Sequence, residues 1–209
     1  MDVSPRRVGL QLPQMSAVGP GARLLSTLTL IGIVVLAACT QSEWRELAVS
    51  EGGFSVLMRP EPHYAKQQVD TPAGRMFAHL YSSDRRDAYF AVGYSDYPLA
   101  LVMGTAPDAL FAGIRETWVR RIEGRLVSGD RLSLGKQYPG IEFVAEGKIK
   151  GEDAFLHARL FLVDQRLYQI IAIGRKGEVA QGLVNRYLNS FRLIEPDAIG
   201  TLGIEPAPS

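Results

Sequence analysis

The stretch AFLHARLFLVDQRLYQIIAIG, residues 154–174, decides the fold. Its first half alternates as an extended strand does, with successive side chains on opposite faces. One face receives Leu156, Ala158, Leu160 and Leu162, and the other receives Phe155, His157, Arg159 and Phe161. Residues 167–174 are almost all apolar, which is typical of a strand at the centre of a sheet. A polar turn at residues 164–166 joins the two strands.

Further extended runs precede this pair in the sequence. The two nearest, residues 125–136 and 141–149, are separated by Tyr138, Pro139 and Gly140, which predict a turn. The earlier runs are residues 54–58, 64–69, 75–83 and 88–97. A polar loop at residues 82–87 predicts that the last two of these form an antiparallel hairpin.

Two stretches have the spacing of amphipathic helices. Thr105 predicts an N-terminal cap, with Pro107 in the first turn and Asp108 three residues after the cap. The apolar stripe that follows consists of Leu110, Phe111, Ile114, Trp118 and Ile122. The second stretch is residues 178–192. The side chains expected to face the core there are Ala180, Leu183, Val184, Tyr187, Leu188 and Phe191. This order of elements predicts one α+β domain over residues 44–194, an antiparallel β-sheet with two main amphipathic helices packed on it.

An apolar run, LLSTLTLIGIVVLAAC at residues 24–39, lies before the domain. Arg6, Arg7 and Arg23 precede it, and Asp2 is the one acid there. A basic segment, an apolar run and small residues at a cut point predict a secretory signal over residues 1–38. The run is shorter than the ~20 apolar residues that a membrane-spanning helix needs.

The end of this run, Leu36, Ala37, Ala38 and Cys39, resembles the bacterial lipoprotein box. The resemblance implies cleavage before Cys39 and a diacylglycerol on its thiol, so that the exported chain is anchored by lipid to a membrane of the cell envelope. Residues 39–43 would then be a lipidated tether. The alternatives are an uncleaved anchor helix, a cysteine without a role, a start at Met15, and a twin-arginine signal at Arg6 and Arg7.

Composition limits what the exported part can be. Cys39 is the one cysteine in 209 residues, so no disulfide forms within the chain and stability must come from a hydrophobic core. Losing the charged residues of positions 1–38 changes the net charge from +1 to −1, which does not favour nucleic acid as a partner. Residues 195–209, rich in proline and glycine, predict a disordered tail.

Four short segments resemble a group of small exported bacterial proteins. They are FSVLMRP at residues 54–60, TPAG at 71–74, YPGIEF at 138–143 and LYQ at 167–169. The layout is similar to the Mog1/PsbP-like α/β/α sandwich, over roughly residues 44–193. Members of that fold are mostly non-enzymatic and include an extrinsic photosystem II subunit, a Ran-binding protein and envelope lipoproteins. The resemblance therefore implies a binding or scaffolding role, and no cofactor or metal.

The sequence carries none of the common catalytic motifs, such as G-x-S-x-G, H-E-x-x-H or the Walker A loop. His63, His79 and His157 are far apart, although His79 and His157 both lie in strands and could meet across a sheet as a metal pair. Two ordinary half-buried histidines are the alternative. The acids Glu142, Glu146, Glu152 and Asp153 could supply a carboxylate pair for acid–base chemistry, or could be ordinary surface acids.

Aromatic residues give the best indication of a binding surface. Tyrosine and arginine are enriched at binding hot spots, and the candidate partner-binding residues are Tyr89, Tyr94, Tyr97, Arg85 and Arg86. The alternative is that these tyrosines, with Tyr138, pack under a helix. The basic cluster Arg120, Arg121 and Arg125 is either a solvated helix end or a contact for lipid headgroups.

Taken together, these features favour a non-enzymatic envelope lipoprotein that binds a protein partner or scaffolds a membrane complex. A carrier of a small apolar ligand is the alternative, followed by an enzyme whose site follows no known motif.

Overall fold

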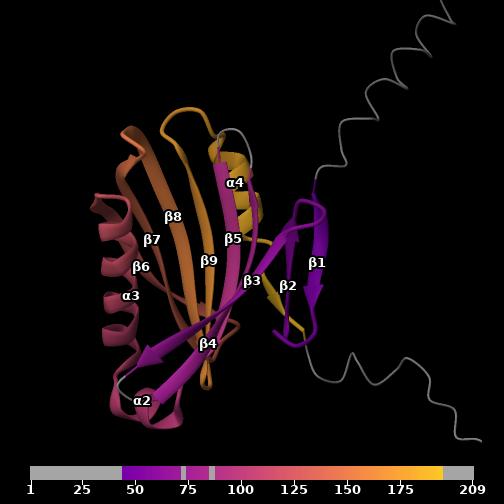
Figure 1. Cartoon of the computed structure of the whole chain (residues 1–209), viewed down its shortest axis with the longest axis vertical. Coiled ribbons are helices and arrows are strands. Elements are labelled where there is room, and N and C mark those ends of the chain that lie inside the picture. The colour runs from indigo at the N-terminus through magenta and orange to yellow at the C-terminus, as the bar shows by residue number, and fades with distance from the viewer. Residues whose placement is uncertain (1–43, 72–73, 85–87, 195–209) are drawn as a thin grey trace, which may run out of the picture. The chain divides into compact units, whose positions relative to one another are not determined.

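A seven-stranded antiparallel sheet is the largest element of the structure, a computed structural model that describes residues 44–71, 74–84 and 88–194 (Figure 1). Its strands, from edge to edge, are His63–Thr71 (β3), Gly74–Asp84 (β4), Ala88–Asp96 (β5), Arg166–Arg175 (β9), Glu152–Val163 (β8), Tyr138–Ile149 (β7) and Arg125–Leu134 (β6). The α+β class and the antiparallel sheet are confirmed. The predictions for the signal, Cys39, Arg85, Arg86 and the tail lie outside the described residues.

The quoted stretch forms the middle of this sheet as strands β8 and β9. Leu156, Ala158 and Leu160 are fully buried in one core, and Phe161 is buried in a second core on the opposite face. Strand β9 is buried on both faces because elements cover the sheet on both sides. The predicted alternation and the predicted central strand are both confirmed.

A second, three-stranded sheet joins the two ends of the domain. Its strands, in order, are Arg45–Val49 (β1), Phe54–Met58 (β2) and Arg192–Leu193 (β10), with β2 in the middle. The Ile194 N–H donates to the Gly53 carbonyl at 2.9 Å. The sequence interpretation missed β1, whose residues RELAV are mostly exposed and include two charged side chains, and β10, which has only two residues and carries little periodic signal.

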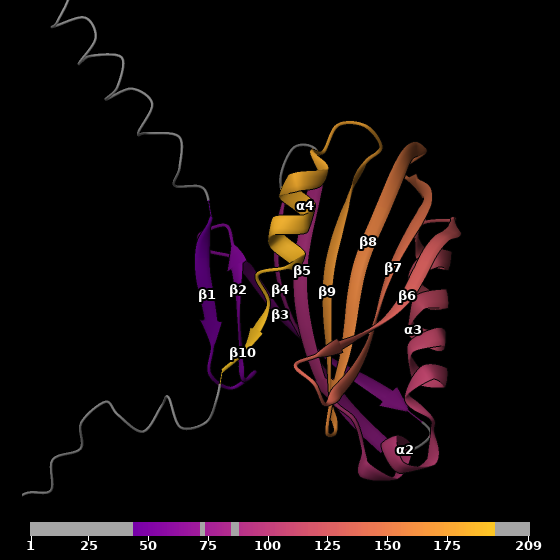
Figure 2. The ribbon, with the colours of Figure 1, turned by 180° about the vertical axis from the view of Figure 1, so that it is seen from behind.

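Three helices complete the described part: Leu99–Gly104 (α2), Pro107–Arg121 (α3) and Gln181–Leu188 (α4). Helix α3 packs on β7 and helix α4 packs on β8, β9 and β2. Phe111 of α3 belongs to one core and Val184 of α4 to the other, so the two helices cover opposite faces (Figure 2). No helix among the described residues is both long and apolar enough to cross a membrane.

Three predicted boundaries are wrong. Thr105 does not cap α3, because it is the extended residue that ends α2, and the N-cap is Ala106 without a side-chain bond. Helix α4 stops at Leu188, and the Ser190 hydroxyl donates to the Tyr187 carbonyl and accepts from the Leu57 N–H. Residues 138–140 lie inside β7 and form no turn. The turn is made by residues 135–137, where Gly135 has the positive φ of +62°.

Candidate functional site

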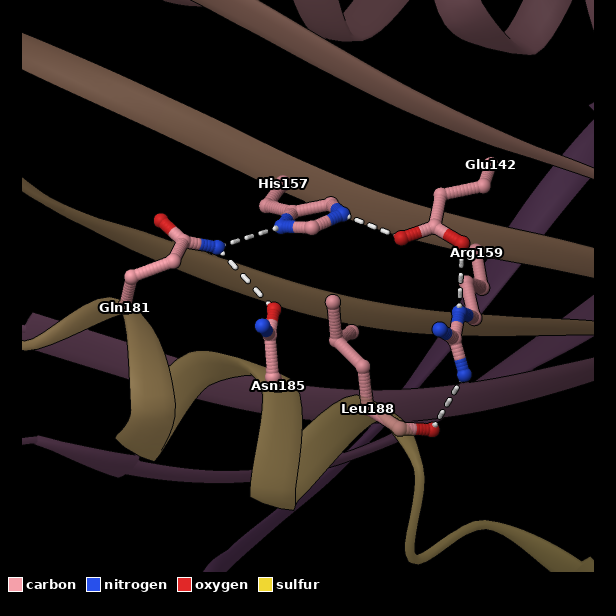
Figure 3. Close-up of polar contacts among 6 residues, drawn as sticks. All are labelled: Glu142, His157, Arg159, Gln181, Asn185 and Leu188. Carbon is pink, nitrogen blue, oxygen red and sulfur yellow. Dashed lines mark hydrogen bonds and ion pairs between the residues drawn. The ribbon is translucent and has the colours of Figure 1, made fainter. Parts of the chain in front are cut away.

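A polar cluster lies on the sheet face that α4 covers (Figure 3). Glu142 of β7 pairs across the sheet with Arg159 of β8, and His157 precedes Arg159 on the same face. The Arg159 Nε donates to Glu142 Oε2 at 3.0 Å, and His157 Nε2 lies 2.5 Å from Glu142 Oε1. One carboxylate therefore has a nitrogen partner for each of its oxygens.

The same cluster attaches α4 to the sheet. Arg159 Nη1 donates to the Leu188 carbonyl at 3.1 Å, which satisfies an acceptor at the C-terminal end of the helix. At the other end, Gln181 Nε2 lies 3.5 Å from His157 Nδ1 and donates to Asn185 Oδ1 at 3.0 Å. Figure 3 shows the side chains of Gln181 and Asn185 reaching from the helix to the His157 side of the cluster.

The electrostatics of the cluster keep the carboxylate ionised. Burial raises the pKa of Glu142, but the hydrogen bonds from His157 and Arg159 outweigh it, so the pKa lies below its usual value. A histidine beside a carboxylate is an arrangement that acid–base catalysts use. Here, however, Arg159 holds the second oxygen and His157 is only 7% exposed. The geometry is that of a bridge between helix and sheet.

An open depression borders this cluster and is lined in part by Glu142, Arg159 and Arg192. Both arginines direct donors to main-chain carbonyls: Arg159 to Leu188, and Arg192 to Asn189 and Phe191. The hydrogen bonds of these two guanidinium groups thus stabilise the turn that connects α4 to β10.

The predicted histidine pair does not form. His79 is in β4 and His157 in β8, and strands β5 and β9 lie between them. Among the other predicted acids, Glu146 and Asp153 line one open depression together with Arg125 and Lys176. Glu146 pairs with Arg125 and Lys176, whereas Glu152 pairs with Arg175. Within the described ranges, no group of three or more His, Cys, Asp or Glu side chains is placed to hold a metal ion.

The predicted aromatic set is divided between the two faces of the sheet. Tyr94 is buried in the core under α4, but Tyr89 and Tyr97 pack against the core under α3. The reason is the two-residue period of β5, which turns odd and even positions to opposite faces. The three tyrosines therefore do not form one surface.

A different aromatic surface lies along β3 and β4, at one edge of the large sheet. We call it the edge aromatic surface, and it consists of Tyr64, Lys66, Phe77, His79 and Tyr81. Tyr64 is 46% exposed and Phe77 is 45% exposed. The Lys66 ammonium lies 4.6 Å from the centre of the Phe77 ring. The sequence analysis missed it, because Tyr64 and Lys66 become neighbours of the β4 residues only through the pairing of the two strands.

The inner part of this surface is tightly ordered. The Tyr64 hydroxyl lies 2.9 Å from His79 Nδ1, and the His79 ring stacks on Tyr94 with 4.4 Å between ring centres. Arg166 covers the Tyr94 ring at 4.9 Å while its guanidinium binds both carboxylate oxygens of Asp96. Burial raises the pKa of Tyr94 to about 12, and burial together with Lys66 lowers the pKa of His79. The stack is thus held in place by a hydrogen bond, by ring contacts and by the ion pair of Arg166 with Asp96.

The comparisons with known proteins give a structural likeness and no family match. No protein-family model matches it, and no curated protein does. Among solved structures, a match is PA94, a protein of unknown function from Pseudomonas aeruginosa described as a candidate regulator. The match covers 79% of this chain and 99% of that one, at 9% sequence identity and a TM-score of 0.36.

Proposed function

We propose that this protein is a non-enzymatic, lipid-anchored binding module of a bacterial cell envelope, which holds a protein partner on its edge aromatic surface. Residues 1–38 would export the chain and Cys39 would carry the lipid, as the box at residues 36–39 implies. The architecture proposed with it is the Mog1/PsbP-like sandwich, with α3 and α4 as its two main helices.

The observation that carries the partner-binding proposal is the exposure of Tyr64 and Phe77 beside the edge strand β3. Large aromatic side chains that stay half exposed are the type that protein interfaces bury as anchors. No described strand pairs with the outer side of β3. Its outward N–H and C=O groups can therefore extend the sheet into a partner's backbone, while the aromatic side chains supply specificity.

Cross-linking in the native membrane, followed by mass spectrometry, tests the partner. The double variant Tyr64→Ser with Phe77→Ser should lose the partner that the unmodified chain captures. The matched control is Leu126→Ser with Val127→Ser, which changes two exposed apolar residues on the opposite edge strand β6. Equal capture by both double variants would contradict the proposal.

The anchor has its own test, which is the mass of the intact chain extracted from its membrane. We expect a chain that begins at Cys39 and carries acyl groups. A Cys39→Ser variant should retain residues 1–38 and lack the acyl mass. An unmodified wild-type chain with residues 1–38 still attached would overturn the anchor but not the binding surface.

A further inference from the structure

The domain begins at one particular end of the large sheet. Trp44, the first described residue, packs its ring against Phe90 at 5.0 Å between centres. Phe90 lies two residues from the start of β5, where Ala88 pairs with Gly174 near the end of β9. The β7–β8 hairpin turns at this same end, because Gly174 pairs with Phe155 near the start of β8. We call it the hairpin end.

The opposite end of the sheet carries α2. Strand β5 runs from Ala88 at the hairpin end to Asp96, and α2 follows directly. At ~3.3 Å per strand residue, the two ends are about 25 Å apart. Met103 and Leu99 of α2 are 80% and 55% exposed there. This end is called the α2 end below.

The chain length before Trp44 decides which end faces a membrane. Cys39 precedes Trp44 by five residues, which reach at most about 18 Å when fully extended. That reach is shorter than the length of the sheet. If Cys39 carries the lipid, as the proposed function states and as this inference requires, the hairpin end lies next to the bilayer.

The tip of the β7–β8 hairpin has the side chains that suit such a position. Ile149 is 37% exposed and stands between Lys148 and Lys150, which are both exposed. Apolar side chains flanked by lysine are favoured at the interface between lipid headgroups and acyl chains. No ion pair engages Lys148 or Lys150 among the described residues, although Asp153 lies across the hairpin from Lys148.

Neighbouring elements add further cations to this end. The Lys148 N–H donates to the Ile122 carbonyl at 2.6 Å, which fixes the C-terminal end of α3, with Arg120 and Arg121, beside the hairpin. The nearby acids Glu146 and Glu152 are already paired with basic side chains. Glu123 and Glu178 also lie in this region, so the hairpin end as a whole carries charges of both signs. Attraction to an anionic bilayer therefore depends on the two lysines at the tip and not on the net charge of the hairpin end.

We propose that the hairpin tip, residues 148–150, rests on an anionic lipid bilayer, with Ile149 entering the headgroup layer and both lysines binding lipid phosphates. The α2 end, with Met103, then points away from the membrane. The edge aromatic surface stays on the flank of the domain, where a partner can reach it.

Site-specific quenching tests this orientation on the full acylated chain in vesicles of phosphatidylcholine and phosphatidylglycerol. The acylated Cys39 leaves a newly introduced cysteine as the single target for a dye. Dyes on Ile149→Cys and Met103→Cys compare two exposed apolar positions at the two ends. A quencher attached to lipid should reduce the Ile149→Cys signal at least about two-fold more than the Met103→Cys signal. Equal or reversed quenching overturns the proposal.

The charge contribution is tested by Lys148→Glu with Lys150→Glu, labelled at Ile149→Cys. This variant should lose the excess quenching while it still floats with the vesicles through its lipid. Unchanged quenching would overturn the role of the lysines. A wild-type chain that does not float would instead refute the lipid anchor, which separates a failure of the proposed function from a failure of the orientation.

Discussion

Glu142 binds both His157 and Arg159, the two sheet residues whose side chains contact polar groups of α4. Its pKa in the folded state lies below the ordinary value of 4.5, so its contribution to stability is present above that value and is lost as the pH falls through the lower, folded-state pKa. Glu142→Gln should lower the free energy of unfolding at neutral pH by about 1–3 kcal/mol, because charged hydrogen bonds to His157 and Arg159 are lost.

Urea unfolding at neutral pH and at acid pH below 4.5 measures this effect. The difference in the free energy of unfolding between wild type and Glu142→Gln should become smaller on acidification. Glu46→Gln, at an exposed position of β1, is the control and should change stability little at either pH. A gap that stays constant would mean that Glu142 stabilises the fold without its charge.

At the scale of elements, the contact between α3 and β7 depends on a glycine. A Cβ at Gly147 would meet the Ile122 carbonyl oxygen at 2.1 Å, so Gly147→Ala should destabilise the domain by about 1–3 kcal/mol. Gly113 lies inside α3 with no atom near its would-be Cβ, and Gly113→Ala should stabilise by about 0.5–1 kcal/mol. Thermal melts of the two variants should therefore shift in opposite directions, and a shift in the same direction would contradict the packing described.

The elements that the sequence predicts well are those with long periodic patterns. Strands β8 and β9 and helix α3 follow the alternation or the stripe that the sequence displays. The cap of α3 could not be predicted, because Thr105 suits a cap by residue type but is taken by the end of α2. The placement of Tyr94 and Tyr89 was also not predicted. They are close in the sequence, but the alternation of β5 places them on opposite faces of the sheet.

At the scale of the whole molecule, Phe191 is one of several aromatic side chains that join the two sheets. Phe191 packs against Phe54 of the small sheet, and against Phe161 and Tyr168 of the large one, with ring centres 5.3–5.8 Å apart. Phe191→Ala should cost about 3–5 kcal/mol and leave one cooperative transition. Near-UV circular dichroism and tryptophan fluorescence should report the same midpoint, and two separate midpoints would show that the sheets unfold independently.

The edge aromatic surface could be predicted only in part from the sequence, because it forms only when strands distant in the sequence pair in the folded domain. The alternation of Phe77, His79 and Tyr81 is visible in the sequence of β4. Their neighbour Tyr64 joins them through a register of β3 with β4 that no local pattern determines, and Arg166 arrives from more than seventy residues away. Long-range pairing of this kind is decided by the core as a whole.

The pairing of β10 with β2 also has a consequence for how the chain is made. The last described strand completes a sheet that the first strands begin, so the domain cannot close while its C-terminal residues are still within the ribosome. Translation adds about 5–20 residues per second, so β2 waits roughly 7–27 seconds between its own synthesis and that of β10. The proposed export would benefit from that delay, because a domain that has already closed cannot pass through a channel that admits unfolded chains.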